Sequence, residues 1–454
     1  MKLTKISICF LLALCGAGVQ AQSVLRLDLK ETIAMANDSS LSAFRYKNMY
    51  LSGYWEYRSY KAARLPSLTL NMTPAQYYRY ITQRYDSQEN VDVYREQQML
   101  SASAGLSLAQ NFDLLGGTFY VDTQLDYMRN FGDSKSTQFS TVPFRIGYQQ
   151  DLLGYNAFRW DRKIEPLKFE KVKKEYLYNA ESVSEEAVTY FFDLAMAQAD
   201  YKLALDNVAT TDTLYAIGEQ RQKIAAISQA DLLTLKLDKV NARNTLRNAE
   251  ITRKRAMSAL ATFLNLDRNS YIEIDLPARP RYIDVSADHA MTLARENNPT
   301  YLAYRNLLQQ DLVSFTVSVP LVDWGVRKGK YNMAKNNLNV VKIAARQEEI
   351  SLEEDVMMTV SDFSVQQDLI ASAEEALDLA ELAYDQTRKR FIIGKADINS
   401  LTLALNRQQE AQKNYIQAMQ NYWLNYYKIR KLTLFDFESG MSLSERFDFD
   451  NLRR

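Results

Sequence analysis

The stretch Tyr215–Leu232 reads YAIGEQRQKIAAISQADL, and it returns at Tyr384–Leu401 as YDQTRKRFIIGKADINSL. A helix-opening phrase at Glu31–Ser40 also returns, in altered form, at Asp288–Asn298. Solenoid repeats have periods of roughly 20 to 50 residues, and these phrases recur at much longer intervals. The chain is therefore predicted to consist of two large, related halves.

Each copy of the first phrase is interpreted as a helix, a tight turn and a second helix. In the second copy, Gly394 can end a helix in the left-handed conformation, and Asp397 then caps the next helix. In the first copy, Ala225 takes the glycine place, Ser228 is the N-cap, and Asp231 completes a capping box. The chain is thus expected to present two helical-hairpin tips.

Long stretches almost free of Gly and Pro lead into and out of these turns. They predict one helical hairpin from Asn156 to about Leu266 and another from about Val326 to Leu432. A helix of about 55 residues spans about 80 Å, which no single globular core needs, so coiled-coil arms are expected. The second hairpin carries a heptad seam with alternating steps of four and three residues. Its apolar members are Leu352, Val356, Phe363, Ile370, Ala373, Leu377, Ala380, Tyr384 and Phe391, and Thr359, Gln366 and Thr387 fill the gaps between them.

A first helix is predicted at 30–63, and after it apolar and polar side chains alternate with a period of two. The alternation predicts strands within 66–80, 98–110, 119–128 and 142–149, and a further strand at 313–321. Such alternation with tyrosine-rich flanks is typical of outer-membrane barrel strands. It is also the pattern of an antiparallel sheet with one face in water, which is the favoured interpretation of the strands alone. The predicted signal peptide and the flanking helices reverse that preference in favour of barrel strands.

Residues 1–21 are predicted to be a signal peptide with a cleavage site after Ala21. The alternatives are a buried N-terminal helix, or cleavage before Cys15 followed by lipidation. Removal of the leader at Ala21 takes away Cys9 and Cys15, the two cysteines of the chain. Disulfides, thiolate metal sites and a cysteine nucleophile are therefore not expected.

Charge and motif content argue against several classes of function. The 454-residue chain has 55 Lys and Arg against 55 Asp and Glu, which does not favour a nucleic-acid partner. His289 is the single histidine and is interpreted as a solvated or capping residue. The sequence has no G-x-S-x-G motif, phosphate loop or metal-ligand spacing, so neither an enzyme nor a cofactor or metal site is predicted.

These features divide the chain into five parts. They are a signal peptide at 1–21, a first repeat at 22–276, a linker at 277–285, a second repeat at 286–434 and a polar, poorly ordered tail at 435–454. The aromatic run from Tyr415 to Tyr427 is interpreted as packing between helices.

The order of these elements resembles the outer-membrane efflux protein (TolC) family. The resemblance rests on the leader, the two repeats, the Leu65-Pro66 step from helix to strand, the Val319–Gly325 strand exit and the Arg390–Gly394 tip. It implies a mainly α fold with a β-barrel part, in which long antiparallel coiled-coil helices form a periplasmic tunnel. Three protomers would pool their strands in one lipid-facing outer-membrane barrel, because one protomer has too few strands to close it.

The resemblance also implies a function and partners. The chain would be a homotrimeric outer-membrane exit duct for efflux or type I secretion, passively conducting small molecules or exported proteins. It would meet a periplasmic adaptor protein and an inner-membrane pump of the RND, ABC or MFS type. The alternative is a periplasmic coiled-coil scaffold or adaptor that forms no pore.

At the tip, the resemblance carries over one gate residue. Asp231 matches an aspartate with which the founding member closes its tunnel, but the tyrosine and arginine partner positions are Phe391 and Ala396 here. Two further aspartate positions at the entrance are Ser400 and Leu403. The candidates that remain for a polar constriction are Asp231, Arg390, Lys395 and Asp397. Their alternative role is as helix caps and solvated charges.

The two halves also differ in length on the strand side. From the helix start to the end of the last strand, the first repeat uses about 120 residues and the second about 33. We therefore expect an irregular or incomplete strand hairpin within 300–321.

Overall fold

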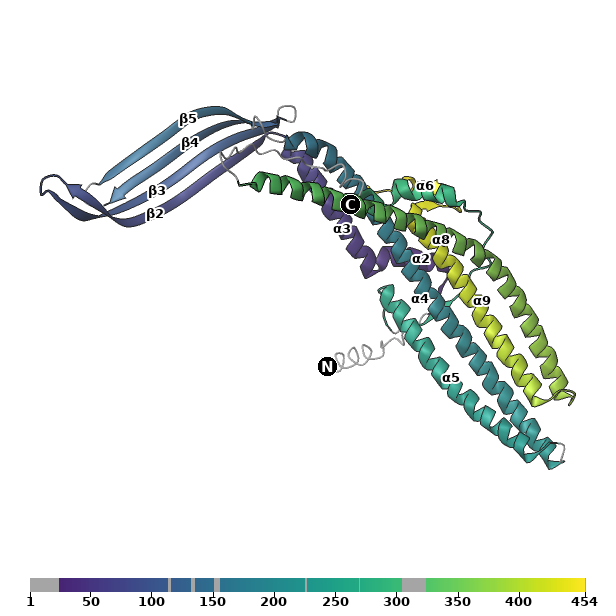
Figure 1. The fold of residues 1–454 in the computed structure, drawn as a ribbon. Helices are drawn as coiled ribbons and strands as arrows, with labels where there is room; N and C mark the ends of the chain where they lie inside the picture. Colours follow the sequence, from purple (N-terminus) through teal and green to yellow (C-terminus); the bar gives the residue numbers. More distant parts are fainter. Residues whose placement is uncertain are drawn as a thin grey trace, which may run out of the picture. The chain divides into compact units, whose positions relative to one another are not determined.

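The structure is a computed structural model, and it describes residues 24–112, 116–131, 135–150, 156–224, 227–268, 270–303 and 324–453 (Figure 1). The predicted signal peptide, Ala225 and the predicted strand at 313–321 lie outside these residues, as does nearly all of the expected hairpin within 300–321. The chain forms two compact units. The first comprises Met1–Tyr50, Lys174–Leu302 and Gln347–Arg454, and the second comprises Leu51–Lys173 and Ala303–Arg346.

The second unit contains a four-stranded antiparallel sheet. Its strands are β2 (Ser67–Asp86), β3 (Val91–Phe112), β4 (Gly117–Phe131) and β5 (Ser136–Gln150), paired in that order. The four strands predicted in this region are confirmed, and β2 and β3 are longer than the alternation indicated. They continue into tyrosine- and glutamine-rich sequence, where period-two alternation of hydrophobicity is weak but the cross-strand ladder goes on.

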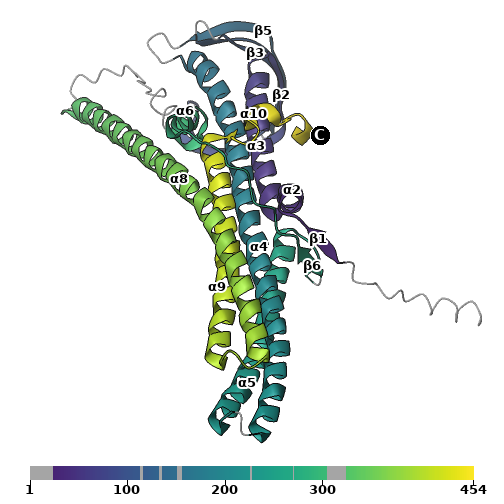
Figure 2. The same cartoon turned by 90° about the vertical axis from the view of Figure 1, so that its right-hand side faces the viewer.

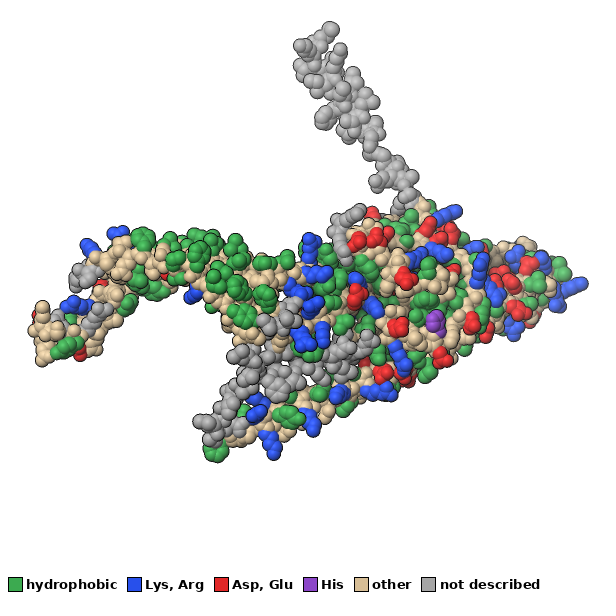
Figure 3. Space-filling view, turned by 90° about the horizontal axis from the view of Figure 1, so that it is seen from above, with side chains coloured by type: hydrophobic (Ala, Val, Ile, Leu, Met, Phe, Trp, Pro, Cys, Tyr) green, Lys and Arg blue, Asp and Glu red, His purple; other side chains and the backbone are tan. Residues whose placement is uncertain are grey.

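Register gives this sheet one apolar and one polar face. An apolar row crosses all four strands through Leu68, Leu108, Val121 and Ile146. Leu68 is 70% exposed and Ile146 68% exposed, so the described residues leave the two ends of this row uncovered. The neighbouring row is polar and consists of Thr69, Ser107, Asp122 and Arg145, with the Arg145 guanidinium paired to the Asp122 carboxylate. In Figure 3, hydrophobic side chains gather over the strands.

Among the described residues, β2 and β5 are the outer strands of this sheet, and each pairs on one side. The β2–β3 register shifts between Thr73 and Gln76, on either side of Pro74. Proline cannot donate to a ladder, so a bulge on an outer strand is where it is tolerated. The sheet therefore ends in two ladders of backbone groups that have no strand partner within the described part of the chain.

The predicted helix at 30–63 is two helices, α2 (Leu29–Ser39) and α3 (Leu41–Ala63). Ser40 separates them with an extended backbone at ψ 149°. The buried Ser40 hydroxyl accepts a hydrogen bond from the Ala43 N–H at 3.1 Å, so this serine acts as the N-cap of α3. The prediction of a single continuous helix was wrong, because the extended backbone at Ser40 ends α2 before its side chain caps α3.

Two helical hairpins follow. The first is α4 (Ala157–Lys223) with α5 (Gln229–Phe263), and the second is α8 (Val326–Ile392) with α9 (Ile398–Thr433). Figures 1 and 2 show α4, α5, α8 and α9 side by side toward their turns. The first hairpin turn follows Lys223, so Gly218 lies within α4. Its bare Cα lets Leu235 pack closely, since a Cβ there would come within 2.6 Å of the Leu235 side chain.

Most of the hydrophobic core lies in the first unit, among α2, α4, α5, α8 and α9. Phe363 on the predicted seam and Tyr422 on α9 are each 1% exposed, with ring centroids 5.0 Å apart. The interpretation of the Tyr415–Tyr427 run as helix packing is confirmed for Tyr422, Tyr426 and Tyr427, which are buried. Beside this core, β1 (Leu25–Leu27) pairs in parallel with β6 (Ile272–Ile274), and α6 (Ala287–Asn297) packs on α9.

The C-terminal segment is folded, which corrects the expectation of a poorly ordered polar tail. It contains β7 (Phe435–Asp436), β8 (Met441–Ser442), α10 (Leu443–Arg446) and a 3-10 turn at Asn451–Arg453. Leu434 is fully buried, and Asp436 is 4% exposed and accepts a hydrogen bond from the Tyr426 hydroxyl at 2.6 Å. The polar composition wrongly suggested disorder, because the buried carboxylate of Asp436 has its partner within the fold.

Candidate functional site

The two hairpin turns of the first unit are joined by an apolar cluster. Leu214, Leu235, Phe391 and Leu401 are buried together, one from each of α4, α5, α8 and α9. Because each helix contributes one side chain, the two tips form a single packed end. The repeated phrases found in the sequence therefore meet in the fold.

Arg221 links the two tips through the backbone. Its Nη2 donates to the carbonyl oxygens of Phe391 and Ile392, each at 3.3 Å, and its guanidinium lies 5.5 Å from the centre of the Phe391 ring. The last carbonyls of a helix have no partner within the helix and carry partial negative charge. Arg221 of α4 therefore caps the end of α8.

Sequence reasoning missed Arg221, although a signal was present. Arg221 and Arg390 occupy the same place in the two repeated phrases, seven residues before Ser228 and Asp397 respectively. An arginine kept in both turns near a helix end is suited to binding terminal carbonyls.

The residues predicted to form the turns act as caps. Gly394 has φ +78°, in the left-handed region that favours glycine. The Ser228 hydroxyl accepts from the Asp231 N–H at 3.1 Å, while the Asp231 carboxylate accepts from the Ser228 N–H at 3.1 Å. Asp397 accepts from the Ser400 N–H at 3.2 Å. Hydrogen bonds from the hydroxyl and N–H of Ser400 lower the pKa of Asp397.

The four candidates for a polar constriction do not meet within one protomer. Asp231, Arg390, Lys395 and Asp397 are all exposed. Asp231 and Asp397 each bind their own turn, and among the described residues no ion pair joins either aspartate to Arg390 or Lys395. One protomer therefore presents these charges at its surface.

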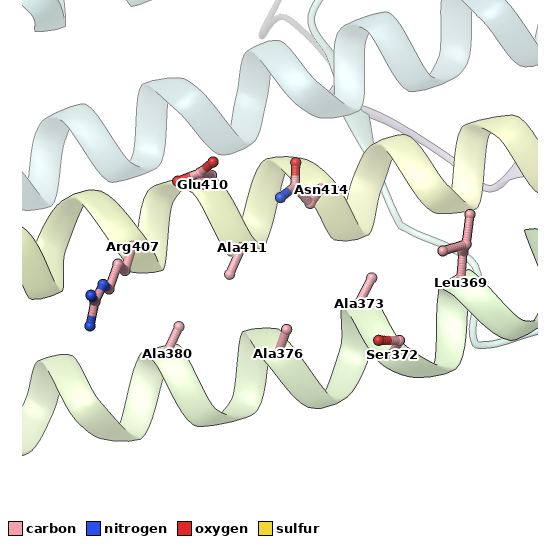
Figure 4. A pocket seen from close by; sticks show the side chains of 9 residues that line it. All are labelled: Leu369, Ser372, Ala373, Ala376, Ala380, Arg407, Glu410, Ala411 and Asn414. Atoms are coloured by element: carbon pink, nitrogen blue, oxygen red, sulfur yellow. The ribbon is translucent and has the colours of Figure 1, made fainter.

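The predicted seam of α8 leaves an open groove against α9 (Figure 4). Ala373, Ala376 and Ala380 face Ala411 across it, and the groove has a volume of about 430 Å³. Arg407, Glu410 and Asn414 form its polar side. The small seam residues thus give a slender hairpin that is not filled by side chains along this stretch.

The described ranges contain no candidate metal site. No group of three or more His, Cys, Asp or Glu side chains is placed to hold a metal ion there. In the same residues, no helix is long and apolar enough to cross a membrane. His289 is exposed and its ring packs edge-on against Phe435 and Phe437.

Residues 284–433, which include the second tip and its long hairpin, match the family model described as "Outer membrane efflux protein". This match covers about a third of the chain and confirms the predicted resemblance to that family over these residues. A search of curated proteins finds no match. The family's members are outer-membrane channels, and the non-enzymatic class and the outer-membrane location predicted from sequence agree with this match.

Solved structures show the same fold over almost the whole chain. The Campylobacter jejuni CmeC outer membrane channel is similar with a TM-score of 0.63 at 12% identity, covering 93% of this chain and 90% of that one. Vibrio cholerae VceC is similar with a TM-score of 0.57 at 14% identity, covering 89% of this chain and 95% of that one. The fold of these outer membrane channels is thus kept at low sequence identity.

Proposed function

We propose that this outer-membrane efflux channel is a homotrimeric exit duct. The observation that carries the proposal is the four-stranded sheet with two outer strands and an uncovered apolar face. Closed barrels need about eight or more strands, so one sheet of this size cannot enclose an aqueous lumen. Pooling the sheets of three copies pairs β5 of one copy with the sheet of the next, puts the apolar row against lipid and puts Asp122 and Arg145 toward the lumen.

The helical hairpins would extend this duct as a periplasmic tunnel. We propose that their tips meet a periplasmic adaptor protein that connects the duct to an inner-membrane pump of the RND, ABC or MFS type. The cargo would be small molecules in efflux, or exported proteins in type I secretion. Transport through the duct would be passive, with the free energy for export supplied by the pump.

Purified full-length protein tests this proposal directly. Native mass spectrometry should show three protomers, and planar bilayers should show discrete conductance steps. A monomer or dimer that gives no conductance in bilayers would contradict the proposed duct. Crosslinking in cells between the hairpin tips and a co-expressed adaptor would then test the partner.

We further propose that the tip charges act between protomers. Arg221 caps α8 of its own chain, and Arg390 holds the equivalent place in the second half. In a ring of alternating tips, the second tip of one copy lies beside the first tip of the next. Arg390 would then donate to the last carbonyls of the neighbouring α4, and Asp231, Lys395 and Asp397 would ring the tunnel entrance.

A further inference from the structure

The ends of α3 and α4 next to the sheet carry aromatic side chains paired with cations. Four such pairs lie at helical spacing, with the cation 4.5 to 5.9 Å from the ring centre. They are Trp55–Arg58, Tyr57–Lys61, Tyr60–Arg64 and Trp160–Lys163. The Trp55 ring is 58% exposed, and the rings of Tyr57, Tyr60 and Trp160 are half-buried beside their exposed cations. Aromatic rings of this kind favour the boundary between lipid tails and water.

Packing holds the two helices together at this level. The rings of Tyr57 and Phe169 stack at 4.6 Å with an interplanar angle of 8°. Gly53 lets Val172 approach so closely that a Cβ on the glycine would come within 2.7 Å of it. The two helix ends that carry the aromatic and basic side chains are therefore packed against each other.

Charge in this region departs from the balance of the whole chain. Lys and Arg outnumber Asp and Glu by three to one in 51–64, by six to three in 156–173, and by six to none in 324–346. All three segments belong to the second unit. We call Arg58, Lys61, Arg64, Arg159, Arg162 and Lys163 the basic collar, and all six are exposed.

The collar lies at one end of the sheet. The Gln110 side chain of β3 donates to the Arg64 carbonyl at 3.0 Å, at the end of α3. Asn156, which precedes α4, packs on Gly116 just before β4. At 1.5 Å per residue, the collar cations lie within about 10 Å of the helix ends that adjoin the strands. That depth is comparable to a lipid headgroup layer, which is several Å thick on each side of the hydrocarbon.

From this arrangement we infer that the basic collar binds the phosphate headgroups of anionic phospholipids in the periplasmic leaflet of the outer membrane. The inference goes beyond conduction and rests on the outer-membrane location of the family. Cations near a charged bilayer surface attract anionic lipid, and long Lys and Arg stems reach the headgroups while their ring partners sit at the boundary. The collar would fix the depth of the strands and couple the channel to the composition of that leaflet.

The test compares two matched variants of the purified full-length channel in detergent. The collar variant is K61Q/R64Q/R162Q/K163Q, and the control, K236Q/R247Q/R255Q/R388Q, removes four exposed cations from the hairpins. Native mass spectrometry and thermal unfolding are measured while phosphatidylglycerol, phosphatidylcholine or inorganic phosphate is added. We expect phosphatidylglycerol to bind wild type and control alike, and the collar variant at least about tenfold more weakly. Phosphatidylcholine should not distinguish the three proteins.

Four results would overturn the inference. They are unchanged phosphatidylglycerol binding by the collar variant, an equal loss in the control, competition by inorganic phosphate at the same phosphate concentration, and loss of the oligomer with lipid binding intact. The last would assign the surface to contacts between protomers. If the collar variant fails to fold, the salt dependence of phosphatidylglycerol binding to the wild type tests the inference. Headgroup binding must weaken in about 1 M NaCl, where the Debye length is about 3 Å, and salt-insensitive binding would contradict it.

Discussion

Gln198 and Gln367 hold equivalent places in the two halves of the chain, and each binds an extended segment with both ends of its amide. Gln198 Oε1 accepts from the Ile274 N–H at 3.0 Å, and its Nε2 donates to the Ile272 carbonyl at 2.7 Å. Gln367 accepts from the Ile283 N–H at 2.7 Å and donates to the Ile283 carbonyl at 3.1 Å. Each half of the chain thus has a glutamine that ties its helical hairpin to the extended chain beside it.

We predict that Gln367→Ala lowers the free energy of unfolding by about 1 to 3 kcal/mol. The substitution leaves the N–H and carbonyl of Ile283 without their partner, and unmet polar groups in a half-buried place cost about this much. Denaturant unfolding followed by circular dichroism measures the change. Gln386→Ala, at an exposed position of the same helix, should change stability by less than about 0.5 kcal/mol. Equal effects of the two would show that the clamp contributes nothing.

Loss of the Arg221 cap should loosen the tip. Arg221→Gln removes the donor to two terminal carbonyls of α8, and we expect a larger open probability in planar-bilayer recordings. If Arg390 caps the neighbouring protomer, Arg390→Gln should act in the same direction and require the trimer to do so. The control is Arg388→Gln, an exposed arginine two residues away. Recordings indistinguishable from wild type for both Arg221 and Arg390 variants would refute a capping role in closure.

The entrance charges are tested by a substitution that keeps the turns intact. D231N/K395Q removes two charges, while the amide oxygen placed at position 231 can still accept from the Ser228 N–H. We expect altered single-channel conductance and ion selectivity with an unchanged unfolding temperature. Unchanged conductance together with unchanged closed-state behaviour would show that Asp231 and Lys395 are only a cap and a solvated charge.

A buried carboxyl gives the first unit a pH dependence. Burial raises the pKa of Glu181 to about 7, although Arg430 donates to it at 2.9 Å. The folded state then holds this proton where the unfolded chain has lost it. Stability from Glu181 is therefore complete below about pH 4.5 and is lost as pH rises to about 7, by about 3 kcal/mol at most.

The measurement is the unfolding temperature between pH 5 and pH 8, for wild type and Glu181→Gln. The variant should show a flatter profile, because glutamine does not titrate. Asp436 does not titrate in this pH range, since its pKa is lowered. Its contribution to stability is lost only in more acidic solution. Parallel profiles for the two proteins would contradict a raised pKa at Glu181.

Local patterns explain which parts of the fold were predictable. The strands, the two turns and the seam through Phe363 follow from side-chain periodicity and capping chemistry, which depend on near neighbours in sequence. Arg221, Gln198 and the C-terminal segment depend on contacts between distant elements. Asp436 is the clearest case. Its charge alone predicts a solvent-exposed residue, but in the fold it is paired with Tyr426 and Arg446. The tip candidates remain a prediction about neighbouring copies.

The two outer strands of the sheet have a consequence for biogenesis. A newly exported protomer carries, in its described part, backbone ladders at β2 and β5 that are ready to pair with any extended chain. Such unpaired edges favour aggregation until they pair with the sheets of other copies. Completion of the ring and entry into the bilayer are therefore expected to be one coupled event. The curvature of the pooled sheet would then set the number of copies, because no further copy can be added once the last sheet pairs with the first and closes the ring.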